Sequence, residues 1–477
     1  MHVKFLIPPV QGRVPDRLFG CNYGFFIQQN VFLLYPATLL MDSGYKVSIT
    51  DCVVEKLSLN QALKESADIY VFYSVFLTRD LDIATAEHIS RIQPNSKIVF
   101  IGPDPTYKPE FYLKNPRFYA VRGEPELTLL DLVKAISSKK SIHKLKGLSY
   151  LKSNNIVNNP PRSFIKDLDS LPIPERSLLK KPFSYSNPKF SNQPSTTMLT
   201  SRGCAFRCYF CIPNSLSFAR ELEYKKYNKQ KPKVALRSPK NIIEEFRLIK
   251  KQGYNSVFVV DDQFVWDKAR TLEILEGIKN LDLEIAILAR CDMLTDLELV
   301  KAMKKSGIKY IDLGIESYDQ KILDDIKKDL KIETIQKCVG NLKKCNIEPE
   351  INVMFGASPL ETKSSVERTI HFVQKLDVDI IHSTICTPFP GTDFREVAIK
   401  KGWTPDREYK PIDPGNQSVI NLPNLSSQDL VKASKKLYKK HYFNLKYLFN
   451  QLRKTKSLKE LKLKFNAALN LWKNIFK

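Results

Sequence analysis

Three cysteines lie in the stretch Ser201-Arg202-Gly203-Cys204-Ala205-Phe206-Arg207-Cys208-Tyr209-Phe210-Cys211, where their spacing is C-x3-C-x2-C. Thiolates this close together in the chain can wrap one metal centre, but no fourth cysteine or histidine lies nearby. A structural zinc site needs four protein ligands, and a ferredoxin-type [4Fe–4S] cluster takes four cysteines. The loop therefore indicates an iron–sulfur cluster with one iron open to another ligand, while coincidence or a different metal site stays an alternative.

The composition is that of a globular chain in a reducing compartment. At 477 residues, with 43% hydrophobic and 26% charged residues, the chain has room for two or three domains with their own cores. The apolar run Ile69–Leu77 is far shorter than the roughly 20 residues that span a bilayer. Nine cysteines without paired spacing argue against a secreted disulfide framework. We expect a cytoplasmic location.

The net charge of +24 is concentrated near the C-terminus, where residues 431–477 hold fourteen Lys or Arg and one acid, Glu460. Apolar residues recur in the same segment at helical spacing. Three interpretations stay open: a helical cap with solvated lysines, a basic amphipathic helix on an anionic membrane, and a nucleic-acid arm. The apolar residues are Leu445, Leu448, Phe449, Leu452, Leu458, Leu461, Phe465, Ala468, Trp472 and Ile475.

Residues 1–140 alternate short apolar runs with helical patterns, which predicts a doubly wound, Rossmann-like α/β domain. Ligands of such sheets bind beyond the carboxyl ends of the strands. Those ends carry Pro8-Pro9, Ser74, Gly102-Pro103-Asp104 and Gly123-Glu124. The expected strands are Val3–Ile7, Lys46–Thr50, Ile69–Val75, Lys97–Ile101 and Phe118–Val121, and the expected helices include Phe26–Leu40 and Asn60–Lys64.

Residues 141–195 are rich in Pro, Ser and Asn and predict a connecting segment. A second βα series over 196–410 predicts a partial (β/α)6 barrel with the cysteine loop at the carboxyl end of its first strand. Residues 411–477 are expected to form a basic helical extension. The expected strands are Thr197–Thr200, Ser256–Val260, Ile285–Ala289, Tyr310–Gly314, Glu350–Met354 and Ile380–Cys386, and the expected helices are Pro239–Gln252, Asp267–Lys279, Thr295–Lys305 and Lys363–Lys375.

Residues 1 to about 410 resemble the radical S-adenosylmethionine (SAM) enzymes with an N-terminal cobalamin-binding domain. That group includes the hopanoid methylases, the anaerobic magnesium-protoporphyrin ester cyclases and the phosphinate methylases. Each matching motif is short, but their order and spacing together are specific. The motifs are the cysteine loop, Gly102–Thr106, Arg122–Glu126, Asp167–Pro174, Val260–Phe264, Gly314–Ser317 and Pro388–Thr392.

The resemblance implies that Cys204, Cys208 and Cys211 ligate three irons of a [4Fe–4S] cluster as thiolates. The open iron would chelate SAM, and an electron from the cluster would cleave SAM to a 5'-deoxyadenosyl radical. The family places an aromatic residue before the last cysteine, against the adenine. Here that residue is Phe210, for which packing in the core is an equally physical role.

Polar residues that follow later strands are the candidates for holding SAM. The resemblance favours Glu316 for the ribose or the ammonium group of SAM, and Arg290 for its carboxylate. We expect Asp261, Asp262 and Ser317 to contribute to the same cofactor site. The alternative is an ion pair at the barrel rim between Arg290 and one of these acids.

Cobalamin is the second cofactor that the resemblance implies. The motif D-x-H-x-x-G is absent, so the chain has no cobalt-ligating histidine of that kind. Ser74, Gly102 and Pro103 would hold the nucleotide tail. The family often has Gly-Gly-Pro-His where this chain has Ile101-Gly102-Pro103-Asp104, so a domain that only shapes the active site is the alternative.

The resemblance thus implies a cobalamin-dependent methyltransferase acting on an unactivated carbon of a hydrophobic or secondary-metabolite substrate. Cyclisation or rearrangement by the same radical is the alternative within the enzyme class. A basic RNA- or membrane-surface protein with a structural cluster is the alternative outside it. Expected partners are an electron donor such as flavodoxin or ferredoxin and, through the C-terminal tail, the inner membrane face, whereas nucleic acid is disfavoured.

Overall fold

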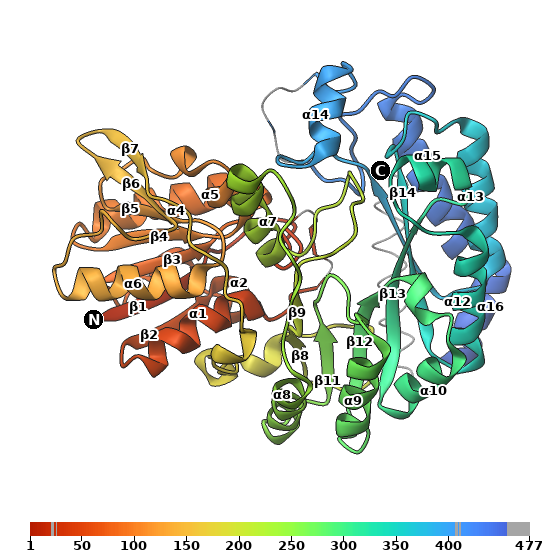
Figure 1. The fold of residues 1–477 in the computed structure, drawn as a ribbon, viewed down its shortest axis with the longest axis horizontal. Coiled ribbons are helices and arrows are strands. Elements are labelled where there is room, and N and C mark those ends of the chain that lie inside the picture. The colour runs from red at the N-terminus through yellow and green to blue at the C-terminus, as the bar shows by residue number, and fades with distance from the viewer. Residues whose placement is uncertain (21–22, 25, 406–408, 410–411, 456–477) are drawn as a thin grey trace. The chain divides into compact units, whose positions relative to one another are not determined.

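A computed structural model describes residues 1–20, 23–24, 26–405, 409 and 412–455 (Figure 1). The chain forms two compact units. The first contains Met1–Ala205, Ile212–Leu288 and Lys305–Gly307, and the second contains Phe206–Cys211, Ala289–Lys304 and the chain from Ile308 onward. These units cut across the domain limits expected from the sequence, which therefore stay a prediction.

A seven-stranded sheet opens the first unit, with the strand order β2-β1-β3-β4-β5-β6-β7. Strands β1 to β5 pair in parallel, whereas β6 and β7 are antiparallel. All five strands expected in this region are present, and their 2-1-3-4-5 order puts the ligand-binding edge of the sheet between β1 and β3. The five strands are β1 (His2–Ile7), β2 (Lys46–Asp51), β3 (Ile69–Tyr73), β4 (Lys97–Ile101) and β5 (Phe118–Val121).

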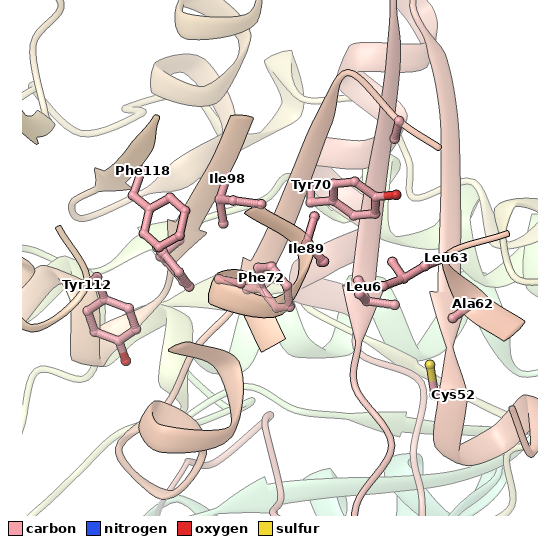
Figure 2. Close-up of a cluster of buried hydrophobic side chains, with 13 residues drawn as sticks. Leu6, Cys52, Ala62, Leu63, Tyr70, Phe72, Ile89, Ile98, Tyr112 and Phe118 are labelled. Atoms are coloured by element: carbon pink, nitrogen blue, oxygen red, sulfur yellow. The ribbon is translucent and has the colours of Figure 1, made fainter. Parts of the chain in front are cut away.

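One core of this sheet combines aromatic and aliphatic side chains (Figure 2). The Phe100 ring stacks on Phe72 with centroids 5.6 Å apart and contacts Tyr112 at 4.7 Å and Phe118 at 5.8 Å. The helices of this region are α1 (Val31–Asp42), α2 (Cys52–Glu55), α3 (Leu59–Ala62), α4 (Arg79–Ile92), α5 (Pro103–Tyr107) and α6 (Pro125–Ser137).

Two expectations for the first 195 residues need correction. The helix expected from Phe26 begins only at Val31, because the Asn30 side chain caps it by accepting the N–H of Phe32 (3.1 Å). The segment expected to be a connection contains β6 (Leu148–Lys152) and β7 (Asn155–Asn158). Their two-residue turn, Ser153-Asn154, has positive φ angles of 48° and 66°, as type I′ hairpins require, but lacks the usual glycine.

The first unit also contains the start of the second βα series. Strands β8 (Ser195–Met198), β11 (Ser256–Val259) and β12 (Glu284–Ala289) pair in parallel, with β11 in the middle. Strand β8 ends two residues before the expected Thr200. The remaining elements are β9 (Ser201–Arg202), β10 (Ala235–Leu236), α7 (Ser215–Asn228), α8 (Pro239–Lys251) and α9 (Lys268–Ile278).

The second unit is built on the parallel strands β13 (Ile308–Glu316), β14 (Glu348–Phe355) and β15 (Ile380–Ile385). All six strands expected in the second series are therefore present, and the α/β class is confirmed. Helices α12 and α13 run along the outside of these strands (Figure 1). The helices are α10 (Leu297–Lys305), α11 (Gln320–Asp325), α12 (Ile332–Lys344), α13 (Lys363–Leu376) and α14 (Asp393–Lys400), and a short 3-10 turn spans Cys291–Leu294.

Helix α15 (Ser427–Tyr442) covers the edge strand β15 with two tyrosine hydroxyls. The Tyr442 hydroxyl accepts the N–H of Ile381 (3.0 Å) and donates to its carbonyl (3.0 Å). Tyr438 bonds both backbone groups of Ser383 in the same way, at 2.8 and 3.2 Å. The edge is thereby closed to further strands, which confirms the cap interpretation for α15.

Helix α16 (Leu445–Lys454) follows, and the tail residues expected to continue its apolar pattern from Leu458 lie outside the described residues. Among the described helices, none combines the length and hydropathy that crossing a bilayer demands.

Replacing Tyr442 with Phe should lower the free energy of unfolding by about 1–3 kcal/mol, because the N–H and C=O of Ile381 lose their partner. Urea unfolding followed by circular dichroism measures the change. Tyr227→Phe, at an exposed position of α7, is the matched control. Equal stability of the two variants would contradict the edge-capping role.

Candidate active site

Asp261, at the end of β11, holds the start of the cysteine loop. Its Oδ1 accepts the N–H of Thr200 (2.6 Å), and its Oδ2 accepts the hydroxyl of Ser201 (2.7 Å). The Asp261 side chain is fully buried, and burial raises its pKa against the effect of these donors. Both carboxylate oxygens of Asp261 accept hydrogen bonds from the start of the loop, so this side chain positions the loop. Its contact with SAM stays a prediction.

The neighbouring Asp262 differs from Asp261 in its hydrogen bonds. Its Oδ1 accepts the N–H of Asn214 (2.6 Å), while its buried Oδ2 makes no hydrogen bond of good geometry among the described residues, although the Ser217 hydroxyl lies near enough to lower the pKa of this carboxyl. Burial raises the pKa of this carboxyl to about 7. Asp262 is therefore the one of the two carboxylates with an acceptor left over for a ligand.

A buried ion-pair network joins the cysteine loop to the Arg122–Glu126 motif within the first unit. The Arg202 guanidinium lies 3.1 Å from Glu124 Oε1 and 2.6 Å from Glu126 Oε1. Arg122 pairs with Glu223 of α7 at 3.1 Å, and all five side chains are buried. Sequence reasoning singled out both motifs but not this pairing, since nothing in either motif names its partner.

The second unit holds the other part of the loop through Tyr209. The Tyr209 carbonyl accepts the N–H of Phe394 (3.0 Å), and its hydroxyl donates to the carbonyl of Ala357. The Tyr209 ring meets the Phe394 ring edge-on at 5.3 Å. The neighbouring Phe210 is buried. An adenine bound in the interior of the site could contact its ring, and that contact stays a prediction.

Glu361 supports the same corner of the site, next to Gly356. Its carboxylate accepts the backbone N–H groups of Gly356 (2.9 Å), Ala357 (2.8 Å) and Ser358 (3.0 Å). Burial outweighs these three donors and raises the pKa of Glu361 to about 7. The carboxylate fixes the backbone that receives the Tyr209 hydroxyl.

Glu316, the predicted SAM ligand, forms a buried ion pair with Lys328 at 2.8 Å. Although burial opposes it, the charges of Glu316 and Cys208 raise the pKa of Lys328 above its usual range. A Cβ on Gly314 would lie 2.5 Å from Glu316 Oε1 and 2.8 Å from Lys328 Nζ, so glycine leaves room for the pair. Lys328 takes one oxygen of Glu316, and sequence reasoning missed it because no motif contains it.

Arg290 faces the loop through Phe206, with its guanidinium 3.6 Å from the ring centroid. It also donates to Asp292 Oδ1 (3.0 Å) and to the carbonyl of Asp329 (2.9 Å). The ion pair found for Arg290 is with Asp292, so the rim pair expected with Asp261, Asp262 or Glu316 stays a prediction. Ser317 is buried beside Thr369, with the two hydroxyl oxygens 3.4 Å apart.

The cysteines supply the right donors for a cluster. All three are thiols rather than disulfides; Cys208 is buried, and Cys204 and Cys211 are half-buried. No three His, Cys, Asp or Glu side chains of the described chain are gathered as a ready-made metal site. Cys208 and Cys211 nevertheless share the second unit with Lys328 and Arg290, and such cations would offset the negative charge of a cluster.

The predicted cobalamin loops lie at the carboxyl ends of β3 and β4. Gly102 has φ +109°, and a Cβ there would lie 2.5 Å from the carbonyl of Ser74. The Ser74 hydroxyl donates to Asp82 (2.8 Å), and Pro103 begins α5. Asp104, which replaces the family's histidine, is buried and bonds Arg79 (2.6 Å) and Tyr112 (2.6 Å).

A hollow of about 50 Å³ opens where β1 and β2 end. It lies on the side of the sheet where doubly wound folds bind ligands. Its lining includes Ile7, Val10, Val14, Arg17, Phe26 and Asp51.

Lys328→Met should destabilise the protein by about 3–5 kcal/mol, because Glu316 is left as a buried, unpaired charge. Adding Glu316→Gln should recover much of this loss. Chemical denaturation of the single and double variants measures it, with the exposed Lys321→Met as control. A double variant no more stable than Lys328→Met would contradict the pairing.

Glu361 should make stability depend on pH. Its pKa is about 7 in the folded chain against 4.5 for the ordinary side chain, so the folded state holds the proton more tightly. Its contribution is therefore largest at low pH and is lost as the pH rises through this window. The unfolding free energy of wild type minus that of Glu361→Gln should fall between pH 5 and 8; a difference that rises or stays constant contradicts this.

The Radical SAM superfamily model matches residues 198–373, which include the cysteine loop and the Glu316 site. An uncharacterized methyltransferase of Pyrococcus horikoshii is 31% identical over 466 residues, covering 95% of each chain. The anaerobic magnesium-protoporphyrin IX monomethyl ester cyclase of Rubrivivax gelatinosus is 24% identical over 337 residues, 69% of this chain and 57% of the cyclase.

A solved structure shares the fold across the whole chain. It is the cobalamin-dependent SAM radical enzyme OxsB with aqua-cobalamin and SAM bound, with a TM-score of 0.74, 16% identity, and coverage of 100% of this chain and 72% of OxsB. The Rossmann-like domain and the radical SAM fold expected from the sequence are thereby confirmed. The chain belongs to the radical SAM superfamily.

Proposed function

We propose that this protein is a cobalamin-dependent radical SAM methyltransferase acting on an unactivated carbon. The observation that carries the proposal is the 2-1-3-4-5 sheet, a doubly wound order whose ligands bind at the carboxyl ends of the strands, where a small hollow opens beside β1 and β2. The same unit contains the ion pairs that anchor the start of the cysteine loop. When bound, the cluster would supply the electron that cleaves SAM, and cobalamin would carry the methyl group.

The residues of the second unit would hold the SAM end of the reaction. Cys208 and Cys211 would bind iron together with Cys204. Lys328 would keep one oxygen of Glu316 in place, leaving Oε2 for the ribose or the ammonium group of SAM. The guanidinium of Arg290 has five N–H donors. It would therefore bind the carboxylate of SAM while it keeps its hydrogen bond to Asp292.

The first unit would hold cobalamin. Gly102 has no Cβ, which gives the Ser74 carbonyl the room to pack against it and holds the two predicted loops together. Asp104 is engaged by Arg79 and Tyr112, so the nucleotide tail would contact Ser74, Gly102 and Pro103 instead. Asp262 has a buried oxygen in this unit that a donor group of a ligand would satisfy.

Substrate, partners and location follow from the chemistry. We infer a small hydrophobic substrate and a low-potential electron donor such as flavodoxin or ferredoxin, since the cluster must be reduced before each cleavage. A reducing cytoplasm suits the thiolates. The limits 1–140, 141–195, 196–410 and 411–477 stand as our proposal for the functional domains.

Ring closure is the second candidate, favoured by the likeness to the Rubrivivax gelatinosus cyclase, which is 24% identical over 69% of this chain. Both candidates require SAM cleavage, so they differ in whether a methyl group leaves SAM for the substrate.

Anaerobically purified protein with reconstituted iron and sulfide should form 5'-deoxyadenosine from SAM and dithionite, and should retain cobalamin through gel filtration. Cys208→Ala should form none, whereas Cys345→Ala, at a cysteine outside the loop, should behave as wild type. Mass spectrometry measures the 5'-deoxyadenosine that is formed and the cobalamin that is retained.

A loaded cluster that forms no 5'-deoxyadenosine would sink the radical proposal. If the protein cleaves SAM but never retains cobalamin, the methyl-transfer proposal is wrong, and ring closure or rearrangement is the remaining candidate reaction. Transfer of deuterium-labelled methyl from SAM to cobalamin would support the methyltransferase.

A further inference from the structure

Helix α16 presents a row of large apolar side chains to solvent. Leu445 is 85% exposed, Phe449 67%, Leu452 61% and Leu448 43%. These residues are spaced i, i+3, i+4 and i+7, so they occupy one face of the helix. Four such side chains together form a continuous apolar surface, which a folded protein normally buries.

The opposite side of α16 is fastened to the second unit. The Tyr447 ring packs edge-on against Tyr442 of α15 at 5.2 Å and lies 5.2 Å from the ring of His441. Lys446 pairs with Asp377 at 3.0 Å, and the Asn444 side chain caps the helix by accepting the N–H of Tyr447 (2.8 Å). The anchored face therefore fixes the orientation, and the apolar face points outward.

A basic residue borders this apolar face. At about 100° per residue, the exposed Arg453 lies beside the strip formed by Leu445, Leu448, Phe449 and Leu452, whereas Lys446 is paired with Asp377. The surrounding segment 431–477 has fourteen Lys or Arg against one acid. An apolar strip in a basic segment is suited to a surface that is apolar inside and anionic outside.

We propose that α16 docks on an anionic lipid bilayer, with its four apolar side chains inserted at the level of the acyl chains and its basic flank against the headgroups. A second copy of the chain is a poorer occupant, because pairing two α16 faces would bring two strongly basic segments together. The proposal is independent of the methyl-transfer reaction.

Flotation of the full-length protein with vesicles tests this. We expect binding to phosphatidylglycerol vesicles, weaker binding to phosphatidylcholine vesicles, and loss of binding at high salt. The double variant Phe449→Ser/Leu452→Ser should bind at least about 100-fold more weakly, from the lost burial of two large side chains. Arg453→Gln should weaken binding about 5-fold.

Ile92→Ser, which removes an exposed apolar side chain from α4, should bind as wild type. Circular dichroism checks that each variant is folded. No binding to anionic vesicles, or equal binding by the double variant, would overturn the proposal. So would a dimer in sedimentation velocity that the double variant abolishes, because the face would then belong to a second copy.

Discussion

The site depends on the buried ion pairs that the Arg202 guanidinium forms with Glu124 and Glu126. Arg202 precedes the first cluster cysteine by two residues, so its position fixes where the loop leaves the first unit. Removing either acid would leave a buried cation with reduced compensation, which the fold tolerates poorly. The two ion pairs therefore hold the start of the loop against the Arg122–Glu126 motif within the first unit.

Much of the architecture was predictable because each strand is indicated by the pattern of its own residues. Alternating apolar runs marked every strand from β1 to β5 and the six strands of the second series. The cysteine loop was predictable for the same reason. The β6–β7 hairpin was missed because its turn, Ser153-Asn154, uses an uncommon residue pair for left-handed φ angles.

The partners of the candidate site could not be predicted, since they lie far apart in sequence. Arg202 and Glu126 are 76 positions apart, and Ser383 and Tyr438 are 55 apart. Lys328 is only 12 residues from Glu316, but a lysine in a charged stretch is normally solvated. Such pairings depend on the tertiary fold, whereas hydrophobic periodicity reports only on each element.

The adjacent carboxylates Asp261 and Asp262 show how position decides chemistry. Sequence treats them alike, yet both oxygens of Asp261 accept hydrogen bonds from the loop, while Asp262 retains a buried oxygen without a hydrogen bond of good geometry in the described chain. A buried unsatisfied acceptor is costly unless a ligand completes it. Asp261 therefore builds the loop, and Asp262 is the carboxylate of the two that a bound cofactor would stabilise.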